Sequence, residues 1–405
     1  MTASPVSQSD TLIAQTAAVS APNYSPLPIV AERAEGVWLW DVDGRKYLDC
    51  ISAYSSLNHG HRHPRIVAAL VGQAARLTLT SRALHNDQMG PFLADLCHLT
   101  RMQMALPMNT GAEAVETAIK LARKWGYRVK GVPRDRAEIV ACRNNFHGRT
   151  TTLVGFSSES QYRDDFGPYA PGFSLVDFGD LEALRAALTP NTVAFLVEPI
   201  QAEAGIIVPP PGYLAAARGL CRERGVLFVL DEIQTGFGRT GRMFAHEHEP
   251  GAEPDILVVG KALGGGVYPV SAVIASRALL TLFQPGDHGS TFGGNPLAAA
   301  VGRAALAVLV DENLAARAAD LGEHLLAAAR DLRAPCIADV RGRGLLIGIE
   351  IARSHGTARR YCEELAHRGV LAKDTHEQVI RIAPPLVVTR AELDWLVTQL
   401  RAVLR

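Results

Sequence analysis

Five short apolar runs alternate with helical patterns through the middle of the 405-residue chain. They lie at 138–142, 194–197, 226–230, 256–259 and 270–275. Strands of a parallel sheet that is covered by helices on both faces are buried on both sides, so they appear as continuous apolar runs. The helical patterns between the runs supply the crossovers that parallel strands need. The sequence therefore predicts one large α/β domain with a mostly parallel sheet, over residues 65–302.

The pattern changes beyond residue 302. A long stretch rich in Ala and Leu predicts a helix, and two strand patterns follow it; these segments lie at 303–330, 344–351 and 379–382. Thr389 and Glu392 have the spacing of a capping box, which marks the start of a last helix. These features predict a smaller, separate α+β domain over residues 303–405.

The segment before residue 65 is expected to pack with this smaller domain. Residues 36–51 have the pattern of a hairpin that turns at Asp43 and Gly44, a pair that suits a tight turn. We therefore assign 23–64 to an N-terminal segment beside the C-terminal domain. Residues 1–22 are rich in Ser, Ala, Thr and Gln and lack strong periodicity, so a flexible leader is expected there.

Charge and cysteine usage exclude several classes of protein. The chain has 41 Lys plus Arg and 41 Asp plus Glu, so it has no formal net charge and binding to nucleic acid is not expected. No apolar run has the roughly 18 residues that a membrane helix needs, so no membrane association is expected either. The six cysteines are scattered without a Cys-x-x-Cys pair, which argues against a disulfide scaffold and favours a reducing, cytoplasmic location.

Two charged residues follow separate strand candidates. Asp231 comes directly after the run at 226–230, and Lys261 lies shortly after the run at 256–259. Ligands of open α/β sheets bind beyond the carboxyl ends of the strands, so both side chains would face one crevice. A lysine there can be a Schiff-base nucleophile, and a carboxylate can hold the protonated ring nitrogen of pyridoxal phosphate (PLP). A solvated lysine and a helix-capping aspartate are the alternative interpretation.

An anion site is indicated where a helix is expected to begin, after Thr110. Thr110 and Glu113 have capping-box spacing, and apolar residues recur behind them with a helical period. Free backbone N–H groups and the helix dipole favour phosphate at such a terminus. Gly111 lets the backbone approach the anion closely. A capped helix start without a ligand is the alternative.

Three histidines alternate at His59, His61 and His63. Alternation would place them on one face, as in a metal-binding strand. The neighbouring Gly60 and Pro64 favour a turn instead, and a metal site usually needs a supporting carboxylate or further ligands. We therefore expect no metal site.

Four motifs, in order along the chain, resemble those of the class III PLP-dependent aminotransferases, and within them the ornithine δ-aminotransferases. The motifs are 109–114 (NTGAEA), 231–236 (DEIQTG), 260–263 (GKAL) and 289–296 (GSTFGGNP). The resemblance runs from about residue 23 to the C-terminus. It implies the α/β fold of PLP-dependent transferases of fold type I, the aspartate-aminotransferase-like fold, with a large and a small domain.

The resemblance assigns the residues that contact the coenzyme ring. By this resemblance, Lys261 bonds to PLP and transfers the proton, Asp231 pairs with the pyridinium nitrogen and Gln234 contacts the ring oxygen O3′. Phe146, in the segment NFHGRT, is expected to stack on the ring. The adjacent His147 receives no role, because many ornithine aminotransferases carry tryptophan at that place.

The resemblance assigns the phosphate to two loops. Thr110, Gly111 and Ala112 would bind it from the same subunit. Ser290 and Thr291 lie in the second loop, where Thr291 would bind the phosphate of the partner subunit's site. A homodimer with active sites at its interface is therefore implied.

Five further residues match positions of the ornithine branch. Tyr24 and Arg149 match residues that hold the α-carboxylate of ornithine, and Tyr54 matches a side chain that shapes the pocket for a long diamino acid. Arg381 matches the arginine for the α-carboxylate of glutamate and 2-oxoglutarate. Glu203 is its expected counter-ion.

This set addresses a selectivity problem, because ornithine carries an α-amine and a δ-amine. A free Arg381 would bind the α-carboxylate in bidentate fashion and place the wrong amine at the coenzyme. Glu203 can neutralise Arg381, so that Tyr24 and Arg149 hold the carboxylate at the far end. An ordinary surface ion pair, worth about 0–1 kcal/mol, is the alternative for each arginine.

The implied activity is transfer of the δ-amino group of L-ornithine to 2-oxoglutarate, which gives L-glutamate 5-semialdehyde and L-glutamate by a ping-pong mechanism. Two alternatives remain open. An N-acetylornithine or 4-aminobutyrate aminotransferase would share the coenzyme motifs, and a PLP-binding regulator would keep the fold without turnover.

Overall fold

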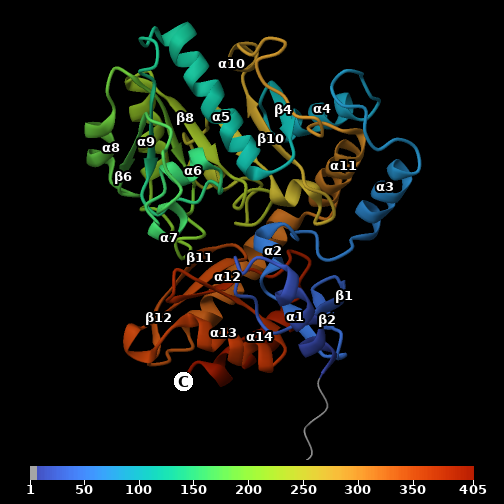
Figure 1. Ribbon diagram of the computed structural model, residues 1–405. Helices are drawn as coiled ribbons and strands as arrows, with labels where there is room; N and C mark the ends of the chain where they lie inside the picture. The colour runs from blue at the N-terminus through green and yellow to red at the C-terminus, as the bar shows by residue number, and fades with distance from the viewer. Residues whose placement is uncertain (1–6) are drawn as a thin grey trace, which may run out of the picture.

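The computed structural model describes residues 7–405, and its large domain is built around a seven-stranded sheet (Figure 1). The strand order is β4-β10-β9-β8-β7-β5-β6. The strands are β4 (Met104–Met108), β5 (Glu138–Cys142), β6 (Phe173–Val176), β7 (Thr192–Val197), β8 (Leu227–Asp231), β9 (Ile256–Val259) and β10 (Ser271–Ala275). Strands β6, β5, β7, β8 and β9 pair in parallel, and β10 is antiparallel to both of its neighbours. The predicted α/β fold with a mostly parallel sheet is confirmed.

Helices cover both faces of this sheet, which explains why its strands are apolar throughout. In β8, Phe228 and Leu230 pack into the same core as residues of α9 (Tyr213–Glu223). Leu227 and Val229 point to the other face, into the core that contains α5 (Gly111–Trp125). Successive strand residues thus alternate between two cores, as the pleat requires.

The C-terminal domain has a four-stranded sheet in the order β11-β12-β15-β14. Its elements are β11 (Ile337–Arg343), β12 (Leu346–Ile351), β14 (Lys373–Thr375), β15 (Val379–Ile382), α12 (Leu314–Arg330), α13 (Ala358–His367) and α14 (Arg390–Val403). The capping box predicted at the last helix is confirmed, because the Thr389 hydroxyl accepts from the Glu392 backbone and the Glu392 carboxylate accepts from the Thr389 backbone.

The helical stretch predicted over 303–330 is confirmed, but it is interrupted once. The structure has two helices, α11 (Pro296–Asp311) and α12, with Asn313 between them in the left-handed conformation at φ 51°. Asparagine tolerates this conformation because its short polar side chain bonds locally. Alanine and leucine recur on both sides of the break, so helix periodicity alone does not reveal it.

The two ends of the chain share one sheet, in the order β1-β2-β3-β13. It consists of β1 (Ala31–Glu35), β2 (Trp38–Asp41), β3 (Lys46–Asp49) and β13 (Val370–Leu371). Strands β2 and β3 form the predicted antiparallel hairpin, and β3 pairs in parallel with β13. Figure 1 accordingly shows the first and last parts of the chain together, below the large domain.

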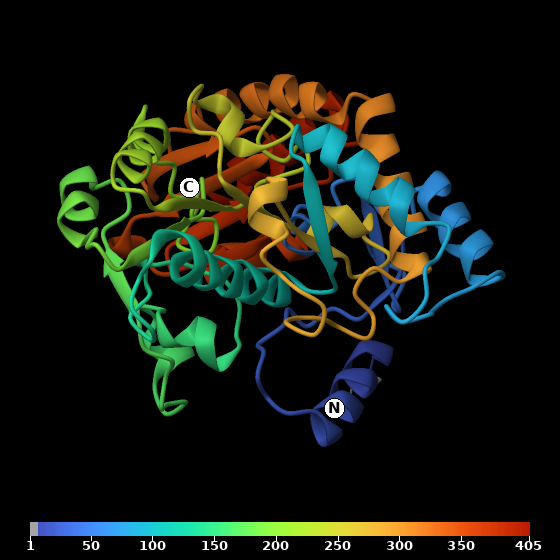
Figure 2. The same cartoon turned by 90° about the horizontal axis from the view of Figure 1, so that it is seen from above.

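A helix, α1 (Gln8–Val19), occupies most of the segment for which a flexible leader is expected. Ser7 and Asp10 form a capping box at its start, and the Ser9 hydroxyl contacts the Asp43 carboxylate. The helix projects from the body of the molecule in Figure 2. Its residues are mostly exposed, so an apolar face could not have revealed it. The expectation for residues 1–6 falls outside the described chain.

The remaining elements connect these parts. They are α2 (Ser52–Ser55), α3 (Pro64–Ala74), α4 (Met89–Thr100), α6 (Thr151–Gly155), α7 (Ser160–Arg163), α8 (Leu181–Ala187), α10 (Arg277–Leu280) and the short turns η1 (Gly126–Lys130), η2 (Ala245–His248), η3 (Lys261–Gly264) and η4 (Arg353–His355). Over residues 7–405, no helix is both long and apolar enough to cross a membrane.

Candidate functional site

A cavity of about 190 Å³ lies at the carboxyl ends of β5, β7, β8 and β9. This is the edge of the sheet where an open α/β fold binds its ligands. Six of the residues predicted to contact the coenzyme line the cavity, namely Gly111, Ala112, Phe146, Asp231, Gln234 and Lys261. They come from four separate segments of the chain, so only the fold brings them together.

Lys261 opens the η3 turn directly after β9 and Gly260, and its backbone is left-handed at φ 48°. Burial, helped by the charge of Arg381 and opposed by Glu203 and Asp231, lowers the pKa of its ammonium group to about 8. A neutral amine is the nucleophilic form of lysine. The cavity therefore makes Lys261 a much better nucleophile near neutral pH than a solvated lysine.

Asp231 is the last residue of β8 and is buried at the inner wall of the cavity. One carboxylate oxygen, Oδ2, lies 2.7 Å from Nδ1 of His147, and Oδ1 accepts a 3.1 Å hydrogen bond from the Ile233 backbone. His147 is buried too, and its Nε2 has no hydrogen-bond partner among the described residues. Sequence reasoning missed this role of His147. Its place in the loop after β5, at the ligand-binding edge, is the signal that could have indicated it.

A second buried carboxyl group, that of Glu198, lies on the same cavity and was also missed. Burial raises its pKa well above the usual range, and the nearby Asp231 adds to the rise. Glu198 accepts a 3.1 Å hydrogen bond from the Phe146 backbone N–H. This contact fixes the loop that carries Phe146 against the end of β7.

The start of α5 forms an open cradle beside the cavity. Thr110 is the N-cap, and the predicted capping box with Glu113 is confirmed. A side chain at Gly111 would meet Ile233 at 3.0 Å, and one at Gly148 would meet Ala112 at 2.9 Å. Neither glycine has room for a side chain, so both segments pack closely at the helix start. The free N–H groups of this helix start suit a phosphate. A buried carboxylate, a lysine and this cradle are the groups that PLP requires.

The second predicted phosphate loop, which contains Ser290 and Thr291, lies outside the lining of the smaller cavity. Ser290 accepts a 2.8 Å hydrogen bond from the Asn109 side chain, so it lies next to the start of α5. Thr291 is exposed and is not brought to the cavity of its own chain. Of the predicted phosphate residues, Gly111 and Ala112 line the smaller cavity, and Thr110, Ser290 and Thr291 do not.

A larger cavity of about 600 Å³ is lined by all five predicted substrate residues: Tyr24, Tyr54, Arg149, Glu203 and Arg381. Phe146 lines both cavities. The two cavities therefore adjoin at this residue.

Arg381 and Glu203 form a close ion pair in this larger cavity. Nη1 of Arg381 lies 2.7 Å from Oε1 of Glu203, and Gln234 bonds to both side chains, at 3.3 and 3.1 Å. Burial acts to raise the pKa of Glu203, but the charges of Arg381 and Lys261 prevail and lower it to about 2. Nε and Nη2 of the buried Arg381 have no partner in residues 7–405. These donors suit a carboxylate ligand.

Tyr54 lies against the same arginine, with its ring centroid 4.6 Å from the guanidinium carbon. It belongs to α2, in which Ser52, Ala53, Tyr54 and Ser55 are all left-handed, at φ 48°, 43°, 59° and 71°. A left-handed conformation costs an ordinary residue roughly 1–2 kcal/mol. Strain of this kind is retained where the surrounding structure needs it, often at functional sites.

Arg149 is held by a residue that sequence reasoning did not find. Its guanidinium lies 3.9 Å from the ring centroid of Tyr162, which in turn packs edge-on against Phe146. Burial raises the pKa of Tyr162. Tyr162 therefore fixes both an aromatic side chain of the smaller cavity and a cation of the larger one.

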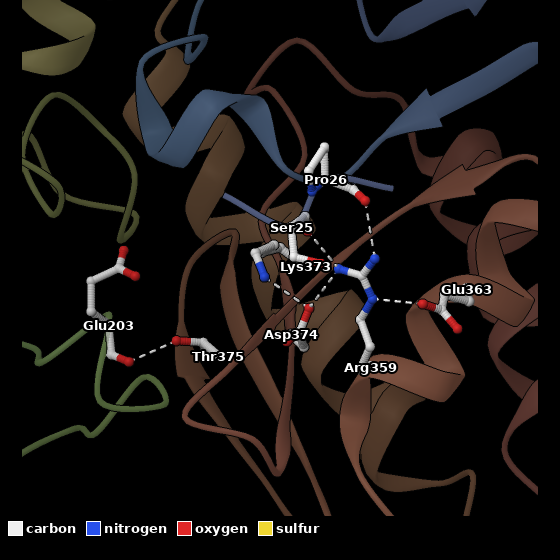
Figure 3. A network of polar contacts seen from close by, with 8 residues as sticks. All are labelled: Ser25, Pro26, Glu203, Arg359, Glu363, Lys373, Asp374 and Thr375. Carbon is white, nitrogen blue, oxygen red and sulfur yellow. Dashed lines mark hydrogen bonds and ion pairs between the residues drawn. The ribbon is translucent and has the colours of Figure 1, made fainter. Parts of the chain in front are cut away.

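The C-terminal domain anchors two walls of the larger cavity (Figure 3). Arg359 of α13 donates to the carbonyls of Ser25 and Pro26, at 3.0 and 3.2 Å, and Glu363 holds its guanidinium at 2.7 Å. The Thr375 hydroxyl of β14 donates to the Glu203 carbonyl at 2.6 Å. Segments that carry Tyr24 and Glu203 are thus both fixed to the small domain.

The three alternating histidines go to three different partners. His59 Nε2 contacts the Ala305 carbonyl, His61 Nε2 contacts Asp49, and His63 Nε2 contacts Glu312. Across the described part of the chain, no group of His, Cys, Asp and Glu residues has the arrangement of a metal site.

Comparison with known proteins places the chain among aminotransferases. The model of the family "Aminotransferase class-III" matches residues 19–404. The ornithine aminotransferase of Bordetella pertussis is 58% identical over 386 residues, which cover 95% of this chain and 93% of that protein. The ornithine aminotransferase structure of Toxoplasma gondii, with PLP at partial occupancy, has a TM-score of 0.97 and 44% identity, and the match covers 99% of this chain and 95% of that one. An acetylornithine aminotransferase from Elizabethkingia anophelis has a TM-score of 0.88 and 45% identity, with 98% of each chain covered.

Proposed function

Because this chain belongs to the class III aminotransferase family, we propose that it is a PLP-dependent enzyme that transfers the δ-amino group of L-ornithine to 2-oxoglutarate. The products are L-glutamate 5-semialdehyde and L-glutamate, formed in two ping-pong half-reactions. The observation that carries the proposal is the buried Arg381–Glu203 pair beside Lys261. This ion pair lies in the larger cavity, where the enzyme must distinguish the two ends of a diamino acid.

PLP, when bound, supplies the electron sink that stabilises negative charge on the carbon next to the transferred nitrogen. The chain would provide the remaining functions. Lys261 moves the proton to and from that carbon as a general base and acid. Asp231, held by His147, keeps a negative charge at the position of the ring nitrogen. Phe146 orients the ring, and the N–H groups at the start of α5 bind the phosphate.

Selection of the δ-amine follows from the charge at Arg381. While Glu203 holds Nη1 of Arg381, a substrate carboxylate next to Arg381 would be repelled by the negative charge of Glu203. The α-carboxylate of ornithine is then bound by Tyr24 and Arg149, and the extended side chain directs the δ-amine toward Lys261. When 2-oxoglutarate enters, Glu203 swings away, and the two carboxylates of the oxo acid bind Arg381 and Arg149.

The proposed assembly is a homodimer in which each subunit contributes to its partner's site. Thr291 is exposed and away from its own cavity, which supports a homodimer in which the partner's Thr291 completes the phosphate site. Tyr24 is exposed at the rim of the larger cavity, in keeping with a site that the second subunit helps to close.

N-acetylornithine transfer is a second candidate, because the acetylornithine aminotransferase of Elizabethkingia anophelis is 45% identical. Rates with L-ornithine, N-acetylornithine and 4-aminobutyrate at equal concentration separate the candidates. We expect the highest kcat/KM with ornithine. A higher value with either competitor would overturn the proposed substrate.

Replacing Glu203 by alanine is expected to free Arg381 for α-carboxylates. Activity with α-amino donors such as L-alanine should then rise about tenfold or more. This is the effect expected when the α-carboxylate gains a charged hydrogen bond to Arg381. Ornithine should also give some α-oxo product. Steady-state rates and product analysis by mass spectrometry measure both effects. Glu159→Ala is the matched control, because Glu159 lines the same cavity but contacts His376 at 3.7 Å. Unchanged regiochemistry in Glu203→Ala would refute the switch.

Uptake of PLP by the apoenzyme is expected to depend on pH. Lys261 reacts with the coenzyme only as the neutral amine, and its pKa is lowered to about 8. Half of the Lys261 side chains are therefore neutral at about pH 8, and the neutral fraction becomes nearly complete about one pH unit above it. The rate of absorbance change on mixing should rise in the same way and level off above that pH. A rate that keeps rising to the range of a solvated lysine would contradict the lowered pKa.

A further inference from the structure

The left-handed turn α2 is the most strained segment of the described chain that lies on the larger cavity. It consists of four consecutive non-glycine residues with positive φ. Non-glycine residues adopt this conformation rarely and mostly one at a time, so a run of four persists only where its surroundings impose it. Its sequence contains no glycine to relieve the strain, so other contacts must hold it.

Asp49, at the end of β3, supplies the first of these contacts. Its Oδ1 accepts hydrogen bonds from the backbone N–H groups of Ile51 and Ser52, at 2.8 and 3.0 Å. Its other oxygen, Oδ2, lies 2.8 Å from Nε2 of His61. Asp49 is buried, so both oxygens are committed to protein partners. The aspartate therefore fixes the point at which the chain enters the turn.

A second set of contacts ties the turn to the strand that carries Arg381. The Ser52 hydroxyl donates to the Ala383 carbonyl at 2.6 Å, and the Ala383 backbone N–H donates to the Cys50 carbonyl at 2.8 Å. Ala383 lies two residues beyond Arg381. Movement of the turn relative to Arg381 would break both bonds.

Tyr54 is the side chain that the turn delivers to the site. Its ring lies on one face of the Arg381 guanidinium, while the edge of that group donates to Glu203. A ring on the face of a guanidinium restricts its plane and leaves its edge free to bind carboxylates. The plane of Arg381, and hence its pairing with Glu203, depends on where Tyr54 stands.

We propose that Asp49 and Ser52 are positioning residues for substrate selection: they lock the left-handed turn so that Tyr54 holds Arg381 on Glu203. This inference rests on the proposed function and adds residues that do not contact substrate. His61 takes part through Asp49, which gives one member of the alternating histidine motif a structural role.

The test measures selectivity in the holoenzyme, as kcat/KM for L-ornithine divided by kcat/KM for L-glutamate. In Asp49→Ala this ratio should fall roughly two- to thirtyfold, the range that a cation–π contact spans. Ser52→Ala removes the second tether and should lower the ratio in the same direction. If Asp49→Ala does not fold, Ser52→Ala carries the test.

Two comparisons separate positioning from general destabilisation. Asp41→Ala is the matched control, because Asp41 is a buried aspartate at the end of β2 that also accepts two backbone N–H groups, those of Asp43 and Arg45. It should lower the melting temperature and leave the ratio unchanged. In a Tyr54→Ala background, the Asp49 and Ser52 substitutions should have no further effect on the ratio, since they act through Tyr54.

The outcomes distinguish the two proposals. If the wild-type protein fails to turn over ornithine, the proposed function is wrong. If it turns over ornithine but the folded variants Asp49→Ala and Ser52→Ala keep the wild-type ratio, the inference about the turn is wrong and the proposed function stands. A fall in the ratio that is equally large in Asp41→Ala would also overturn the inference.

Discussion

Alanine at position 261 is expected to lower the rate of amino transfer by about 10³-fold or more, the scale of a lost general acid–base group. Lys261 lies in the cavity that also holds Asp231 and Gln234, and its lowered pKa makes the amine available near neutral pH. Without it, the base assigned to the carbon that loses a proton is missing. Steady-state assay with ornithine and 2-oxoglutarate measures the loss.

Binding and folding should persist in Lys261→Ala, because Asp231 and the start of α5 remain in place. Exogenous methylamine should restore part of the activity, since it supplies a small primary amine to the vacated space. Lys46→Ala serves as a control, because Lys46 is an exposed lysine of β3 outside both cavities. If Lys261→Ala turned over ornithine at the wild-type rate, Lys261 would have no part in the proton transfer.

Alanine at position 231 should lower kcat by about 10²–10³-fold, as removal of a preorganised charge from an active site commonly does. Asp231 is the buried carboxylate at the inner wall of the smaller cavity, where His147 holds it at 2.7 Å. Asp231→Asn keeps the size of the side chain and the acceptor for the Ile233 N–H but loses the charge. We expect a similar loss of kcat in both variants, with a smaller change in KM for ornithine.

Asp255→Asn is a suitable control for this experiment. Asp255 precedes β9 at the opposite edge of the same sheet, where it binds Arg218 at 2.6 and 2.8 Å. Its substitution should lower the melting temperature without lowering kcat. If Asp231→Asn retained the wild-type kcat, charge at this position would not contribute to catalysis, and Asp231 would be only a structural acceptor for His147.

Local patterns were sufficient to predict much of the framework. The apolar runs at 138–142 and 256–259 match β5 and β9. They could be predicted because parallel strands that are buried on both faces appear as continuous apolar runs. The capping boxes of α5 and α14 depend on residues three positions apart, so they too are visible in the sequence.

Features that depend on contacts distant in the chain were not predictable in this way. His147 and Asp231 are 84 positions apart, and only the order of the strands brings them together. The left-handed turn at 52–55 contains residues of ordinary conformational preference, and its shape is imposed by Asp49 and Ala383. The break before α12 and the exposed helix α1 lack an apolar pattern that would distinguish them.

A single half-reaction shows directly which amine of ornithine the site delivers to the coenzyme. Holoenzyme is mixed with L-ornithine in the absence of an oxo acid, and the product of the single turnover is trapped and identified. We expect L-glutamate 5-semialdehyde, which cyclises, in an amount equal to the coenzyme converted to its amine form. Formation of the α-oxo acid of ornithine instead, or no loss of the coenzyme absorbance, would contradict it.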